Sequence, residues 1–181
     1  GIKRLARVVS SSQQQLEIVQ ELRDDVELPV QVTIASGFPK GDKLDFVTQK
    51  ATELGAVGIW AYPADWSVVK WDCKKLAKKA EKLEKIAQGA AEQSKRNRLP
   101  DIRLFDKKAD FLAQLAAFDK VFIAYEESAK AGEMARLAQE LQAVEDNQKI
   151  LFIFGPEGGI SPKEIEAFEQ AGGIPVGLGP R

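Results

Sequence analysis

One stretch near the end of the chain, residues 151–164, limits the possible folds more than any other, because it combines a strand, a tight loop and a helix start. The apolar run Leu-Phe-Ile-Phe stops at Gly-Pro-Glu-Gly-Gly, and a helix-start signal follows at once. Ser161 suits the N-cap, Pro162 the first helical position, and Glu164 completes a capping box. In open α/β sheets, ligands bind at the carboxyl ends of strands, where glycines let them approach the backbone. The sequence therefore predicts an α/β fold with a candidate ligand-binding loop after residue 154.

The glycine-rich loop itself leaves two interpretations open. Glycine-rich turns are common in α/β domains, so residues 155–159 are also compatible with a simple turn. The loop lacks the G-x-G-x-x-G spacing and the G-K-[ST] ending of phosphate-binding loops. A carboxylate at its centre disfavours phosphate and suits a ligand with hydroxyl, amine or sulfonium groups.

Composition excludes several classes of site. The 181 residues suit one domain, with or without an appendage, and 26 Lys and Arg nearly balance 27 Asp and Glu, so net charge predicts no polyanion partner. The chain has no histidine, and its single cysteine, Cys73, excludes an internal disulfide framework. A histidine or zinc site is therefore excluded, and we expect no metal. The cysteine count, the lack of a long apolar run and the lack of a visible signal peptide favour a cytoplasmic protein with no membrane partner.

Alternation of strand and helix patterns runs through most of the chain. Residues 5–22 read as a β-hairpin. Beyond it, apolar runs predict strands at 30–34, 57–62, 102–105, 121–125, 150–154 and 174–178. Apolar residues at helical spacing predict helices at 44–54, 74–96, 108–117, 132–144 and 162–171. This order predicts a mainly parallel sheet with helices on both faces.

Basic residues gather between residues 74 and 98. For most of these lysines, a solvated helix face with i,i+4 partners explains the pattern. Residues 92–98 differ, because they place cations and amides together at a predicted helix end. Cations there complement the helix dipole, but arginine and amide side chains also suit phosphate and base contacts. Spacing alone does not decide between the two interpretations.

Tryptophans surround the short segment Ser-Val-Val-Lys at residues 67–70. An aromatic ring beside a lysine can stack on a base. Core packing is the ordinary role of tryptophan, and we expect it at least for Trp60.

Several motifs stand in an order typical of one known family. They are Lys-Gly-Asp-Lys at 40–43, Gln-Lys-Ala-Thr-Glu-Leu-Gly at 49–55, Ser-Val-Val-Lys at 67–70, Glu-Gln-Ser-Lys-Arg at 92–96, Gly-Pro-Glu-Gly-Gly at 155–159 and Leu-Gly-Pro-Arg at 178–181. Together they closely resemble the RsmE-type 16S rRNA (uracil-N3) methyltransferases of the SPOUT superfamily. The resemblance implies a methyltransferase domain at 29–181 and a remnant of a PUA-like β-barrel at 1–28.

The resemblance also implies a cofactor, a fold detail and partners. The cofactor is S-adenosylmethionine, held in a C-terminal trefoil knot, a rare exception to the rule that chains do not thread. The substrate is a uridine of 16S rRNA in the small ribosomal subunit, and the protein is a homodimer. The implied cofactor-binding residues are Tyr125, Glu126, Phe154, Gly155, Pro156, Glu157, Gly158, Gly159, Leu178, Gly179 and Arg181.

Methylation at N3 requires loss of a proton whose pKa lies well above neutral, so a cation should stabilise the developing anion and a carboxylate or water should accept the proton. The candidates are Arg96 and Arg181 as electrostatic or RNA-positioning groups, with Glu126 or Glu157 as an orienting carboxylate. The expected RNA-binding residues are Lys40, Lys43, Lys50, Lys70, Lys95, Arg96 and Arg98.

The sequence departs from the family pattern at two places. Trp66 stands where members usually carry an arginine, one of the expected RNA contacts. Members also continue past the position of Arg181 with a segment that completes the knot. We therefore expect residues 1–181 alone to leave the pocket open, to bind S-adenosylmethionine weakly, and to leave Ile165 and Phe168 partly uncovered.

Two alternative functions stay open on the sequence. One is a related SPOUT methyltransferase that acts on another RNA. The other is a non-catalytic RNA-binding dimer, which tight binding of S-adenosylmethionine would argue against.

Overall fold

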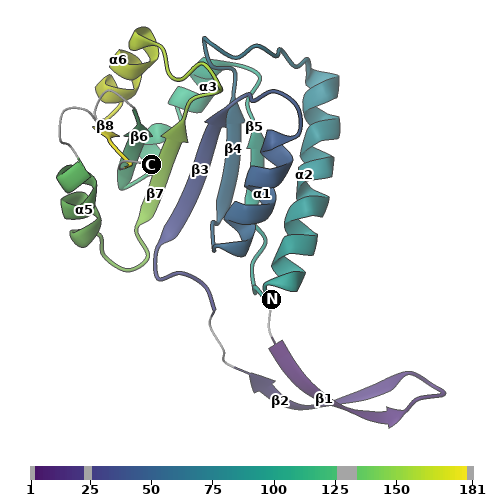
Figure 1. Ribbon diagram of the computed structural model, residues 1–181. Coiled ribbons are helices and arrows are strands. Elements are labelled where there is room, and N and C mark those ends of the chain that lie inside the picture. The colour runs from purple at the N-terminus through teal and green to yellow at the C-terminus, as the bar shows by residue number, and fades with distance from the viewer. Residues whose placement is uncertain (1–2, 23–25, 126–133, 179–181) are drawn as a thin grey trace.

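The computed structural model describes residues 3–22, 26–125 and 134–178, which form a six-stranded sheet and a separate two-stranded hairpin (Figure 1). The order of strands in the large sheet is β5-β4-β3-β7-β6-β8, and each described pair is parallel. Its strands are β3 (Gln31–Gly37), β4 (Gly58–Tyr62), β5 (Asp101–Leu104), β6 (Lys120–Ala124), β7 (Lys149–Phe154) and β8 (Gly173–Val176). The prediction of a mainly parallel sheet is confirmed.

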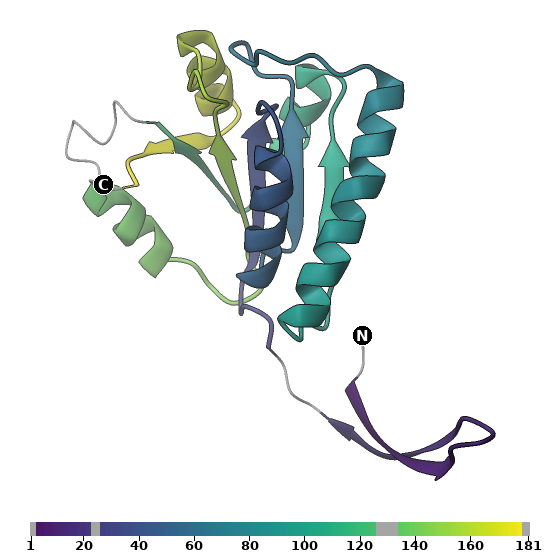
Figure 2. The ribbon, with the colours of Figure 1, turned by 45° about the vertical axis from the view of Figure 1, so that its right-hand side comes forward.

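Helices cover both faces of this sheet (Figures 1 and 2). They are α1 (Lys43–Glu53), α2 (Cys73–Gln93), α3 (Lys108–Leu112), the 3-10 helix η1 (Leu115–Ala117), α5 (Met134–Gln142) and α6 (Pro162–Gln170). Buried side chains of α1 and α2 pack on one face, and those of α3, η1 and α6 pack on the other. Helix α5 packs on the same face as α1, against Phe122 and Phe152.

The largest core cluster explains why the centre of the sheet is fixed. Every residue of β4 is buried, as expected for a strand covered on both faces. Tyr62 at its end stacks on Phe111 of α3, with ring centroids 4.4 Å apart, and meets Phe168 of α6 edge to face at 5.9 Å. These rings join the carboxyl end of β4 to two helices of the same face.

Two expected helices end earlier than predicted from the sequence. The helix expected at 74–96 ends at Gln93, because the Ser94 hydroxyl donates to the Ala90 carbonyl at 2.7 Å and Lys95 takes a left-handed φ of 58°. The helix expected at 108–117 is broken into α3 and η1. The apolar residues of the first helix all lie within α2, the last being Ala91, whereas the apolar spacing at 108–117 continues through the break between α3 and η1.

The expectation that Ile165 and Phe168 are partly uncovered is wrong. Their exposed fractions are 8% and 0%. Both side chains belong to the core cluster that α3, η1 and the strands of that face complete from residues within the chain. Their burial therefore needs no further segment.

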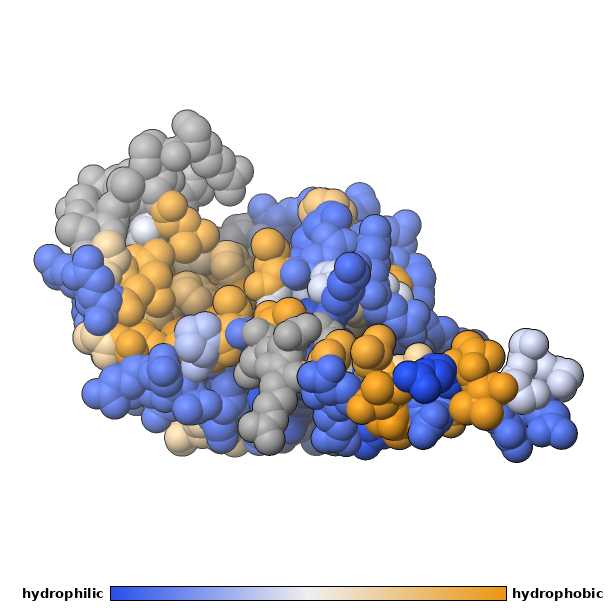
Figure 3. Space-filling model, turned by 90° about the horizontal axis from the view of Figure 1, so that it is seen from below, coloured by the Kyte–Doolittle hydropathy of each residue, from blue (hydrophilic) through white to orange (hydrophobic). Residues whose placement is uncertain are grey.

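The hairpin consists of β1 (Lys3–Ser10) and β2 (Gln15–Leu22), which are antiparallel as expected. Its apolar side chains are exposed and show as hydrophobic areas in the view from below (Figure 3). The exposed apolar residues are Leu5, Val8, Val9, Leu16, Ile18, Val19 and Leu22. A two-stranded hairpin without a core is only marginally stable in water.

Across the three described ranges, no helix has the length and apolar character needed to cross a membrane.

Candidate functional site

Five loops meet at one edge of the sheet, because the carboxyl ends of parallel strands lie together. They follow β3, β4, β6, β7 and β8, at the upper end in Figure 1. The Tyr125 amide donates to the Val176 carbonyl at 3.1 Å, so the loops after β6 and β8 start side by side. The structure thus brings together the described cofactor candidates at 125, 154–159 and 178. Glu126, Gly179 and Arg181 lie outside the described residues.

The turn at 155–159 is closed so tightly that two of its positions require glycine. A Cβ on Gly155 would lie 2.4 Å from the carbonyl carbon of Gly159, closer than real Cβ atoms come. Gly159 has a φ of 83° and donates its amide to the Pro156 carbonyl at 2.9 Å. Pro156 also fills the space beside Gly37 at the end of β3, where a Cβ would lie 2.6 Å from its Cδ.

The central carboxylate of the turn is held by the start of α1. Glu157 pairs with the Lys43 ammonium at 2.9 Å and accepts the Lys40 backbone amide at 3.0 Å. The Lys43 hydrogen bond and backbone amides lower the pKa of Glu157 from 4.5 to about 2. The side chain is 30% exposed, so this carboxylate is ionised and reachable at neutral pH.

Beside the turn, a pocket lies over β3 and the end of β7, next to α1. Its cavity volume is about 410 Å³, and a hollow with hydrophobic walls is visible from below (Figure 3). It is lined by Ile34, Ser36, Pro39, Lys43, Val47, Phe154, Gly155, Pro156 and Glu157. Leu178, after β8, is 57% exposed. A pocket is thus present at the glycine-rich turn, and the expectation that the cofactor site is open stays a prediction.

A charged network that the sequence did not reveal joins the loop after β4 to the start of α6. The Ser161 hydroxyl donates to Asp65 at 2.6 Å, and the Asp65 amide donates to Glu164 at 2.9 Å. Lys108 of α3 pairs with both carboxylates. The Lys108 hydrogen bond, and after it that of Ser161, lowers the pKa of Asp65, while burial raises the pKa of Tyr62 beneath them. The loop at 63–70 is therefore fixed to the glycine-rich side of the site.

Trp66 lies on this loop, directly against the glycine-rich turn. A Cβ on Gly158 would lie 3.1 Å from the Trp66 Cβ, and one on Gly159 would lie 3.8 Å from its ring. The side chain is 48% exposed, whereas Trp60 and Trp71 are 6% and 7% exposed. The core role expected for Trp60 is confirmed. Trp66, unlike the other two tryptophans, lies at the surface.

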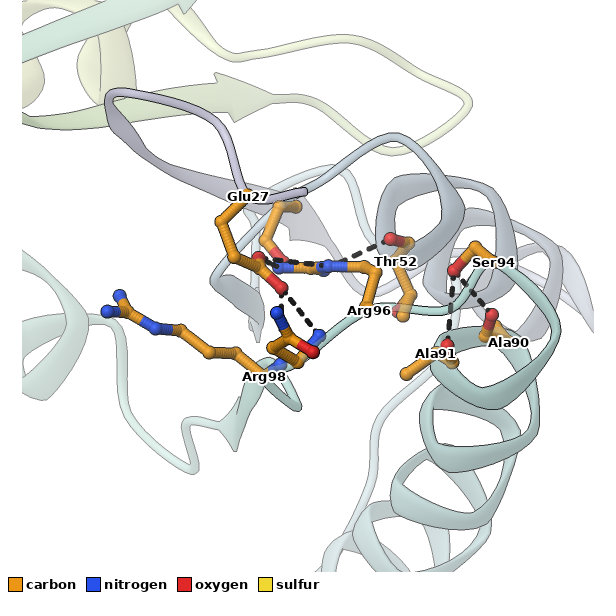
Figure 4. Close-up of polar contacts among 9 residues, drawn as sticks. Glu27, Thr52, Ala90, Ala91, Ser94, Arg96 and Arg98 are labelled. Atoms are coloured by element: carbon orange, nitrogen blue, oxygen red, sulfur yellow. Dashed lines mark hydrogen bonds and ion pairs between the residues drawn. The ribbon is translucent and has the colours of Figure 1, made fainter. Parts of the chain in front are cut away.

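Arg96 lies at the opposite edge of the sheet, inside a buried network (Figure 4). Its Nη1 donates to the carbonyls of Thr52 and Ala56 at 3.0 and 2.6 Å. Its Nη2 pairs with Glu27 at 2.5 Å, and the two side chains are only 3% and 8% exposed. Burial raises the pKa of Glu27, but the hydrogen bond from Arg96 and those from two backbone amides outweigh it, so the net shift is downward.

This network fixes the segment before β3 to the ends of α1 and α2. Glu27 also accepts the backbone amides of Asn97 and Arg98 at 2.9 and 3.2 Å. Arg96 therefore holds the fold together at the amino edge, away from the glycine-rich turn and without an exposed group for RNA. From the sequence, an arginine at a helix end could have either this structural role or a role in RNA binding, and the pattern did not distinguish the two.

The other expected RNA-binding residues fall into two groups. Lys40 and Lys70 lie on loops of the carboxyl edge, Lys43 is the first residue of α1 at the same edge, and all three are exposed. Lys95 and Arg98 are exposed at the amino edge, and Lys50 on α1 pairs with Glu53 at 2.7 Å. The structure therefore does not place all of the expected RNA contacts on one edge of the sheet.

Comparison with known proteins identifies the class. Residues 26–181 match the RNA methyltransferase domain family, and the chain belongs to this family. Within it, the ribosomal RNA small subunit methyltransferase E of Bacillus subtilis is 43% identical over 164 residues. The alignment covers 91% of this chain and 64% of that protein, so the chain spans less than two thirds of this relative. The resemblance stated from the motifs is confirmed.

Two solved structures are similar over nearly all of the chain. Ribosomal RNA small subunit methyltransferase E from Neisseria gonorrhoeae, bound to S-adenosyl methionine, has a TM-score of 0.74 at 25% identity. The match covers 100% of this chain and 72% of that one. A putative methyltransferase from Legionella pneumophila, in complex with the cofactor SAM, has a TM-score of 0.72 at 29% identity and covers 92% and 65%.

Proposed function

We propose that this chain forms the main part of an S-adenosylmethionine-dependent methyltransferase that methylates N3 of a uridine in 16S rRNA of the small ribosomal subunit. The observation that carries the proposal is the closed glycine-rich turn at 155–159, next to the loops after β6 and β8. Family membership and two relatives whose structures hold the cofactor support it. A non-catalytic RNA-binding dimer is not favoured.

The residues at the turn fit the proposed cofactor. Gly155 and Gly159 keep the backbone free of side chains, so an adenosine can approach the main chain. Phe154 and Pro156 offer apolar surface, and Glu157 offers a carboxylate that stays ionised far below neutral pH. When bound, S-adenosylmethionine would supply the methyl group. The turn, Tyr125 and Leu178 would hold and orient it. Glu126, Gly179 and Arg181 lie outside the described residues, and we propose that they also contact the cofactor.

The chain must also favour the deprotonated uracil. A cation near the base would stabilise the developing negative charge, and a carboxylate would accept or orient the proton. We assign the cation role to Arg181 and the carboxylate role to Glu126 or Glu157. Arg96 is assigned a structural role instead, because its side chain is buried at the other edge of the sheet.

We propose three further features of the complete protein. The hairpin in residues 1–28 is part of a PUA-like β-barrel, which would bury its exposed apolar side chains. A segment that follows residue 181 completes a trefoil knot over the loops at the carboxyl edge. The protein is a homodimer. Light scattering combined with size-exclusion chromatography tests the last point, and a monomer at micromolar concentration would contradict it.

The proposed activity is tested with the full-length gene product and small ribosomal subunits from a strain that lacks the gene. Labelled methyl groups from S-adenosylmethionine should appear in 16S rRNA, and nuclease digestion should yield labelled N3-methyluridine. A matched reaction with subunits from the parent strain should show little incorporation, because the site is already methylated. Incorporation into another RNA, or equal incorporation into both preparations, would contradict the proposal.

A further inference from the structure

We propose that Trp66 is a stacking surface for a base of the RNA substrate, next to the glycine-rich turn. Its indole is 48% exposed, although large apolar side chains normally lose exposure on folding. The inference rests on the proposed function, since it names a residue of this site that would read the same RNA.

The backbone on both sides of Trp66 is held in place, which favours stacking on its ring. The residue before it, Asp65, is bonded to Ser161, Glu164 and Lys108. The residue after it, Ser67, donates its amide to the Ala64 carbonyl at 3.0 Å. A side chain held between two bonded neighbours loses little conformational entropy when a base binds.

The surroundings favour RNA rather than a neutral aromatic ligand. The three carboxylates in the area, Asp65, Glu157 and Glu164, are each paired with a lysine. Lys70 and Lys163 are exposed and form no ion pair with any residue in the described ranges. Lys70 lies on the same loop as Trp66, and Lys163 is close enough to Asp65 to lower its pKa. Exposed cations in the same region as an exposed indole suit a phosphate backbone with a stacked base.

The glycine-rich turn and the tryptophan also fit each other. A Cβ at Gly158 would lie 3.1 Å from the Trp66 Cβ, so glycine at this position lets Trp66 lie against the turn without crowding. A base on the outer face of the indole would then lie beside the loops at 154–159, where we place the methyl donor. This arrangement holds the substrate strand at the reacting edge of the sheet.

The test measures methylation of small subunits by the full-length protein carrying Trp66→Ala, Trp66→Phe or Trp66→Arg. Loss of one stacked base should lower kcat/KM by about 5- to 150-fold in Trp66→Ala, and less in Trp66→Phe. Trp66→Arg should keep part of the stacking, because a guanidinium plane can also stack on a base. It should steepen the salt dependence of RNA binding by the amount expected for about one added phosphate contact. The affinity for S-adenosylmethionine should not change. Leu141→Ala, which removes an exposed apolar side chain on α5, is the matched control.

A second readout is the fluorescence of the protein. Since Trp60 and Trp71 are buried, binding of subunit RNA should quench Trp66 most among the tryptophans of this chain, and Trp66→Phe should remove most of that quenching. An active enzyme in which Trp66→Ala has unchanged kcat/KM, or loses cofactor affinity instead, would overturn this inference and leave the proposed function intact. An inactive wild-type protein would overturn both.

Discussion

Replacing Arg96 by alanine should destabilise the fold rather than weaken RNA binding. The change removes the Nε and Nη2 contacts to Glu27 at 3.2 and 2.5 Å and the two Nη1 contacts to main-chain carbonyls. It leaves a carboxylate that is only 8% exposed without its cation. Breaking a buried ion pair in this way costs about 3–5 kcal/mol. That is a large part of the roughly 5–15 kcal/mol that stabilises an ordinary domain.

Urea unfolding followed by circular dichroism measures this effect. With an m value of about 2–3 kcal/mol/M, the midpoint should fall by roughly 1–2.5 M. Arg98→Ala is the matched control, because its side chain is exposed and only its backbone amide contacts Glu27, so stability should change by less than about 0.5 kcal/mol. Arg96→Lys should recover only part of the loss, since one ammonium cannot reproduce the planar guanidinium contacts.

The same ion pair should make stability depend on pH. The folded pKa of Glu27 is lowered, so its contribution is fully present above the ordinary value near 4.5 and is lost as pH falls through the folded value. Arg96→Ala should reduce this acid dependence. An Arg96→Ala protein with wild-type stability and much weaker RNA binding would refute the reasoning. Arg96 would then be an RNA-binding residue, as expected from the sequence.

Three other predictions concern the carboxyl edge and the exposed cations. Gly159→Ala and Gly172→Ala both force alanine into a positive φ, of 83° and 90°, so each should cost about 1–2 kcal/mol of stability. Calorimetry on the full-length protein should show that only Gly159→Ala loses affinity for S-adenosylmethionine. Equal affinity in both variants would contradict the assignment of the turn at 155–159 to cofactor binding. Lys43→Met should raise the pKa of Glu157 from about 2 toward 4.5 in a carbon-13 titration of its carboxyl group, and an unchanged pKa would show that the backbone amides alone hold it. Because the folded value is the lower one, the stabilisation from Glu157 should be lost as pH falls from about 4.5 to about 2 in the wild type. Lys95→Ala and Arg98→Ala should each flatten the salt dependence of rRNA binding by about one unit without changing cofactor affinity, and unaltered slopes would limit RNA contact to the carboxyl edge.

Local signals made the strand, turn and helix at 151–170 predictable. The capping box that Ser161 and Glu164 predict forms with both hydrogen bonds present, and Gly55 ends α1 with a φ of 102°. Such features depend on neighbours within a few residues, so the sequence contains the needed information. The mainly parallel sheet followed from the alternation of strands and helices, and the grouping of the loops at 125, 155–159 and 178 followed from the family resemblance; the strand order was not predicted.

Long-range side-chain pairs were not predictable in this way. Glu27 and Arg96 are 69 residues apart, and Lys108 and Asp65 are 43 apart, and neither pair has a periodic pattern that links its members. A buried arginine and an RNA-binding arginine also have the same appearance at a helix end. Only the fold shows that Arg96 is enclosed while Arg98, two residues later, is exposed.

The central claim is that this chain directs methylation of one uridine of 16S rRNA, and mass-spectrometric mapping of that RNA tests it most directly. The RNA is taken from the parent strain, from a strain that lacks the gene, and from that strain complemented with the wild-type gene or with Gly159→Val. We predict that a single N3-methyluridine disappears on deletion, returns with the wild-type gene, and stays absent with Gly159→Val, whose strained turn cannot hold the cofactor. An unchanged methylation map of 16S rRNA after deletion would contradict the account.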